Sequence, residues 1–132
     1  MKEKLIKLCE EIESAMRTSI DPTDPQQIQE QLANIIPYLA NLSFMISTAT
    51  EIYDKAKGEI ADEIFLYPNK YKDVKANVMS LFIQGKLANE NSLFERVESL
   101  SKNLRSSVEG MRSIISFLKE EIRETKFTNS KL

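Results

Sequence analysis

The sequence of 132 residues contains no histidine, and this absence removes several kinds of chemistry. Without imidazole the chain lacks the commonest general base, the Ser-His and Cys-His nucleophile pairs, and the Glu-x-x-His ligands of helical di-iron bundles. Its single cysteine, Cys9, excludes an internal disulfide and a cysteine-based zinc site. Because Cys9 lies among Leu5, Leu8 and Ile12, we expect it to be a buried apolar side chain.

Glycine, proline and tryptophan are also scarce, with three, four and no residues respectively. The three glycines are isolated, so they form no phosphate-binding loop. Strand-rich folds need turn residues at short intervals, and their scarcity therefore favours long helices. With no catalytic constellation in view, the sequence predicts a protein that is not an enzyme and that has no cofactor and no metal site. The acidic clusters at residues 59–63 and 120–124 are expected to be solvated.

Charge of neither sign is in large excess: 18 basic and 20 acidic residues give a net charge of -2. No overall attraction to nucleic acid or to an anionic membrane follows from this balance. The apolar runs also fall short of the roughly 20 residues that cross a bilayer. We therefore expect no membrane partner, and nucleic acid stays an open alternative. The charged first turns show no signal peptide, which favours the cytoplasm.

Apolar residues at helical spacing predict an all-α fold. We expect one domain over residues 1–132, built as an elongated hairpin or bundle with two long and two shorter helices and coiled-coil-like packing. The expected helices span residues 2–19, 25–66, 71–85 and 91–125. Asp24 suits an N-cap and Pro25 suits the first helical position of the second helix.

The second expected helix carries the clearest pattern, an apolar seam spaced alternately four and three residues apart. Pro37 lies off this seam, and the unbroken spacing favours a kink there over a break. In the short third helix, Val74, Val78, Leu81 and Phe82 are expected to face inward. The seam of the second helix consists of Ile28, Leu32, Ile35, Leu39, Leu42, Ile46, Ala49, Tyr53, Ala56 and Ile60.

The last expected helix carries a second long stripe. Two helices of this length present more apolar surface than so short a chain covers by itself, and the remainder needs a second copy or a partner. The sequence thus predicts a homo-oligomer. The stripe of the last helix consists of Leu93, Val97, Leu100, Leu104, Val108, Met111, Ile115, Leu118 and Ile122.

A ribbon of polar residues runs beside this stripe and is the candidate binding site. Its cations suit phosphate or carboxylate, and its serines supply hydrogen-bond donors. The alternative interpretation is a solvated face with weak intrahelical contacts. Gly110 and its neighbouring serines form a small-residue face that another backbone or a ligand could approach closely. The candidate residues are Arg105, Arg112, Ser113, Ser116, Lys119 and Glu120.

Residues 95–100 and 108–121 resemble the C-terminal half of a loose group of small helical proteins of bacteriophages and prophages. The shared pattern is a Glu-Arg pair followed by Gly-Leu-Arg-Thr-Leu-Ile-Ser-Tyr-Leu-Lys-Glu-Glu. In this chain Met111, Ser113 and Phe117 replace Leu, Thr and Tyr, and a histidine often seen before the glycine is absent. The resemblance covers about 30 residues and implies a phage origin. Its matching polar positions are Arg112, Ser116, Lys119 and Glu120.

Together these observations favour a phage-type accessory protein that acts by stoichiometric binding. Its expected role is counter-defence in the host cytoplasm, by occupying a host protein or by sequestering a small anionic signal. An accessory role in phage DNA recombination or replication is the first alternative, and a structural or assembly protein is the second. The expected partners are a second copy of the chain, a host or phage protein, and a small anionic ligand.

Overall fold

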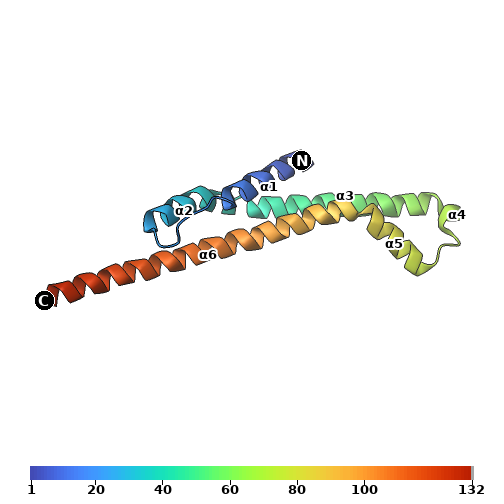
Figure 1. Cartoon of the computed structure of the whole chain (residues 1–132). Coiled ribbons are helices and arrows are strands. Elements are labelled where there is room, and N and C mark those ends of the chain that lie inside the picture. Colours follow the sequence, from blue (N-terminus) through green and yellow to red (C-terminus); the bar gives the residue numbers. More distant parts are fainter. Residues whose placement is uncertain (132) are drawn as a thin grey trace. The chain divides into compact units, whose positions relative to one another are not determined.

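The computed structural model describes residues 1–131, with the side chains of residues 1–126, and within this range it contains helices and no strand (Figure 1). The all-α class is therefore confirmed, with the long helices α3 and α6 packed against other helices. Six helices follow one another in the described range: α1 (Lys2–Met16), α2 (Pro25–Leu39), α3 (Leu42–Leu66), α4 (Pro68–Tyr71), α5 (Ala76–Lys86) and α6 (Ala88–Lys131).

The start of α2 follows from local side-chain chemistry. Asp24 is the N-cap and its carboxylate accepts a hydrogen bond from the Gln26 amide at 3.0 Å, as its sequence predicts. Gln27 ties the preceding turn to the helix, because its side chain accepts from the Asp21 amide at 2.8 Å and donates to Asp24 at 3.1 Å. Hydrogen bonds from the Thr23 hydroxyl and amide lower the pKa of Asp21 in this turn.

The single helix predicted over residues 25–66 is wrong, because the chain forms two helices there. The break lies at Ala40 and Asn41, beyond Pro37, which remains inside α2. The Asn41 amide donates to the Tyr38 carbonyl at 3.0 Å, which makes a tight turn between the helices. After the break the fully buried face of α3 runs through Leu42 and Met45, whereas Ile46 of the expected seam is half-buried.

The prediction for residues 71–85 also needs correction. Residues 68–71 form the separate one-turn helix α4, and α5 begins only at Ala76. Val74, Val78 and Leu81 were expected to face inward, but all three are exposed, whereas Phe82 is half-buried against Tyr71 with ring centroids 5.8 Å apart. The last helix is longer than expected at both ends, since α6 begins at Ala88 and extends to Lys131.

The contacts divide the chain into two compact units, each assembled from segments that are far apart in sequence. Unit 1 comprises Met1–Cys9 and Ser43–Ser99, and unit 2 comprises Glu10–Leu42 and Leu100–Leu132. The core of unit 1 consists of Leu5, Cys9, Met45, Ala49, Leu87, Leu93 and Val97. The core of unit 2 consists of Ile12, Ile28, Leu32, Ile35, Leu42, Leu100, Leu104 and Val108.

Burial of these side chains is the main stabilising term in both units, at about 1.5–3 kcal/mol for each large aliphatic side chain removed from water. Cys9 is buried, as expected from its neighbours. Gln31 and Ser101 are polar side chains buried in unit 2. The side-chain amide of Gln31 donates to the Ala15 carbonyl at 2.7 Å and thereby connects α2 to the last turn of α1.

A helix that crosses a bilayer must be both long and apolar. Taken singly, none of the described helices combines the length and the apolar character that crossing a bilayer requires. Taken together as a bent pair, α2 and α3 do meet the same length and composition test.

Candidate binding surfaces

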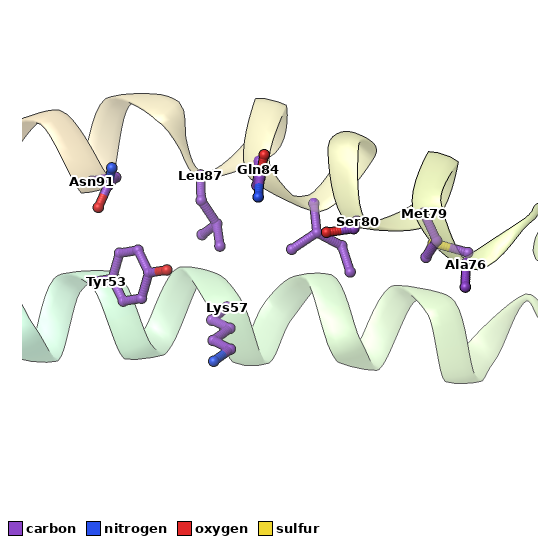
Figure 2. A pocket seen from close by; sticks show the side chains of 9 residues that line it. Tyr53, Lys57, Ala76, Met79, Ser80, Gln84, Leu87 and Asn91 are labelled. Atoms are coloured by element: carbon purple, nitrogen blue, oxygen red, sulfur yellow. The ribbon is translucent and has the colours of Figure 1, made fainter.

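A groove of about 710 Å³ lies in unit 1 between α3 and the segment formed by α5 and the start of α6 (Figure 2). Tyr53 and Lys57 contribute from α3, and the opposite wall contains Met79, Ile83 and Leu87. The volume lies within the range of small-molecule sites, which are mostly apolar clefts with a few polar groups. This groove is open along its length, so it resembles a trough between two helices more than an enclosed cavity.

Both apolar and polar side chains face the groove. Leu87 and Asn91 point toward α3, and the Tyr53 ring lies opposite them with its hydroxyl directed along the gap (Figure 2). Lys57 is the charged residue of the lining, but its ammonium group turns away from α5 (Figure 2). The interior therefore offers van der Waals contact together with two hydroxyl and two amide side chains. It brings no acid and base together.

Sequence reasoning missed this groove, although part of its signal is present. Met79, Ile83 and Leu87 recur at intervals of four, which places them on one side of a helix. Val78 and Leu81 form an equally good apolar pattern, and the sequence predicts that they face inward. Only the position of α3 decides between the two, and that position depends on contacts between distant segments.

A second groove in unit 1, of about 390 Å³, is lined mainly by charged residues. Glu51, Glu59 and Glu90 contribute carboxylates, and Lys2 and Lys55 contribute ammonium groups, so charges of both signs face the same space. Among the residues that the structure describes, no three acidic, cysteine or histidine side chains converge as a metal ion requires. The lining of this groove therefore carries charges of both signs and no metal-binding cluster.

The six candidate residues predicted from sequence all lie on the part of α6 that belongs to unit 2, and all six are exposed. The helix alone brings them together, as a ribbon along one element. Glu120 lies 3.9 Å from the guanidinium of Arg123, an ordinary pair one helical turn apart. A methyl group added at Gly110 would meet no neighbouring atom within 4 Å, so nothing in the described part of the chain uses the close approach that glycine allows.

Beside this ribbon, the apolar stripe of α6 changes from buried to exposed along its length. Leu104 and Val108 are buried in the core of unit 2. The next stripe residues, Met111, Ile115 and Leu118, are half-buried, and Ile122 is 51% exposed. The apolar spacing of the stripe stays the same, while its side chains become more exposed toward the end of α6.

The resemblance to phage proteins concerns this same part of α6, and comparison with known proteins leaves it a prediction. No protein-family model, no curated protein and no solved structure matches the chain.

Proposed function

We propose that the protein acts by stoichiometric binding and that it self-associates through the C-terminal part of α6. The observation that carries this proposal is the incompletely covered continuation of the α6 stripe, where Met111, Ile115 and Leu118 are half-buried and Ile122 is exposed. Apolar surface at this spacing is stabilised when a second helix packs along it with coiled-coil geometry. A second copy of α6 supplies the same spacing and length.

The charged residues beside the stripe favour a parallel pair. Arg112 and Lys119 directly follow stripe residues and are seven residues apart, so both lie along one edge. In an antiparallel pair these cations of the two copies would share an edge and repel each other. In a parallel pair, Glu121 on the opposite edge of one copy lies opposite Lys126 of the other.

Light scattering coupled to size exclusion tests self-association. We expect the double variant Leu118→Asp/Ile122→Asp to be monomeric, because two carboxylates would enter the apolar interface. The matched control is Ser113→Asp/Ser116→Asp, which adds the same charge to the same helix away from the stripe and should keep the mass of the unchanged protein. A monomeric mass for the unchanged protein across the concentration range would refute the proposal.

A cysteine at the interface tests the direction of the pair. Ile122→Cys should form an intermolecular disulfide on mild oxidation, since equivalent stripe positions lie side by side in a parallel, in-register pair. Cys9 is buried and so does not compete as a surface thiol. An oligomer of Ile122→Cys that stays uncross-linked would contradict the parallel arrangement and leave self-association intact.

The resemblance implies a phage origin, and the biological partner stays a prediction. Counter-defence, by occupying a host protein or sequestering a small anionic signal, is the role that we propose for such a binder. What supports it is the exposure of Arg105, Arg112 and Lys119, which can donate charge-assisted hydrogen bonds to phosphate or carboxylate.

A further inference from the structure

The end of α3, α4 and α5 lie together at one end of unit 1 (Figure 1). Several large apolar side chains of these segments are exposed. Phe65 is 84% exposed and Leu66 is 73% exposed at the end of α3, and Tyr67 follows them. Neither α4 nor α5 contains a buried residue. We call residues 65–86 the basic apolar end.

The helix α5 is apolar on two opposite faces. Met79 and Ile83 line the groove against α3 (Figure 2). Val78 and Leu81 fall on the opposite face, because successive residues of an α-helix are turned by about 100°. Val74 lies in the segment before α5, and all three side chains are exposed. Packing within unit 1 therefore accounts for the first face and leaves the second in water.

The charge of this end is opposite in sign to that of the chain. Residues 65–86 contain four lysines and one acidic residue, Asp73, whereas the whole chain carries -2. Glu63, just before this range, lies 3.7 Å from the Lys70 ammonium group, and with it included the local charge is +2. Two of the ammonium groups lie beside aromatic rings, Lys70 over Tyr71 and Lys86 over Phe82, each 5.5 Å from the ring centroid. Exposed apolar, aromatic and basic side chains thus occur together. The four lysines are Lys70, Lys72, Lys75 and Lys86.

We propose that the basic apolar end docks on the surface of an anionic lipid bilayer. Aromatic rings are favoured at the headgroup level, aliphatic side chains enter the boundary of the acyl chains, and lysines pair with lipid phosphates. A bilayer accommodates a protruding apolar surface without a shaped groove. The expectation of no membrane partner rested on the net charge of the whole chain and on the shortness of its apolar runs. The local charge here has the other sign, and docking on a surface needs no run that crosses the bilayer.

Two other occupants explain fewer of these residues. A nucleic acid would use the lysines and the rings but would leave Val78 and Leu81 in water. A single partner helix would cover the outward face of α5 but would leave Phe65 and Leu66 exposed at the end of α3. The bilayer covers the apolar side chains of both elements and matches the charge.

Co-sedimentation of the full chain with vesicles tests the proposal. We expect binding to vesicles of phosphatidylglycerol and phosphatidylcholine mixed one to one, weak binding to pure phosphatidylcholine, and loss of binding as salt screens the charges. Each lysine near an anionic surface contributes about fivefold to the partition coefficient. The variant Lys70→Gln/Lys72→Gln/Lys75→Gln should therefore bind on the order of a hundredfold more weakly.

A matched control removes three exposed lysines elsewhere, Lys7→Gln/Lys55→Gln/Lys57→Gln, and should lose far less binding. The apolar part is tested by Val78→Ser/Leu81→Ser, whose side chains are exposed, so that the helical circular dichroism stays unchanged while binding falls.

Three results would overturn the proposal. The first is an absence of binding to the anionic vesicles. The second is equal loss of binding in the two lysine variants. The third is binding of single-stranded DNA through the same lysines without binding of vesicles. The outcome is independent of self-association, because Leu118→Asp/Ile122→Asp changes no residue of this surface and should bind vesicles through it.

Discussion

Gln31 is a polar side chain in an otherwise apolar part of unit 2, only 3% exposed. Its amide nitrogen donates to the Ala15 carbonyl, one of the last carbonyls of α1, which lack partners within their own helix. Its side-chain oxygen is buried and accepts no hydrogen bond from the atoms that the structure describes. A buried amide is costly unless it is hydrogen-bonded, so this single contact decides whether glutamine is tolerated here.

The variant Gln31→Glu should destabilise the protein strongly. It replaces the donor with a carboxylate oxygen that faces the Ala15 carbonyl, and it buries a charge, which together should cost about 2–4 kcal/mol in the free energy of unfolding at pH 7. Urea unfolding measures this loss. Gln29→Glu makes the same chemical change at an exposed position of the same helix and should stay within about 0.5 kcal/mol. Equal losses in the two variants would contradict the burial of Gln31.

Among the elements, α5 should be the least protected of the longer helices. It has no buried residue and its groove face meets α3 across an open space, so few contacts oppose its local unfolding. We expect its amides to exchange with deuterium about a hundredfold faster than those of residues 93–108 of α6, where local opening costs a few kcal/mol more. Mass spectrometry of peptides after timed exchange measures the difference, and equal protection of the two segments would contradict it.

The elements also show which features the sequence can predict. The start of α2 was predicted correctly because an N-cap and a following proline act within one turn, and Asp24 and Pro25 are neighbours. The break at Asn41 was missed because Leu39 and Leu42 stay three residues apart whether or not the helix continues. Apolar spacing therefore does not report where a helix ends.

The predicted inward face of α5 was wrong for a related reason. Val78 with Leu81, and Met79 with Ile83, both satisfy a helical apolar pattern, and the sequence contains no information that ranks them. The groove depends on this choice and on α3, so it could not be predicted from either segment alone. The ribbon on α6 was predicted as a polar face beside a stripe because both follow from one helix. What it binds depends on another molecule.

At the scale of the whole molecule, unit 1 and unit 2 both draw on α1 and α6, so neither unit is a continuous piece of chain. Removing the whole of α1 or of α6 would therefore take residues from both cores. Ile12 and Leu104 belong to one core, while Leu5 and Val97 belong to the other. For this reason tests of function are best made on the full chain with point variants.

Self-association through α6 makes a prediction about the stability of the full chain. Because association favours the folded state by mass action, a tenfold rise in protein concentration should stabilise a dimer by about 1.4 kcal/mol and raise its Tm by a few degrees. Calorimetry at two concentrations measures the shift. Leu118→Asp/Ile122→Asp removes the apolar continuation of the stripe, so its Tm should not change with concentration. If the unchanged protein also melts independently of concentration, the exposed stripe of α6 does not join two copies, and its covering must come from a different polypeptide.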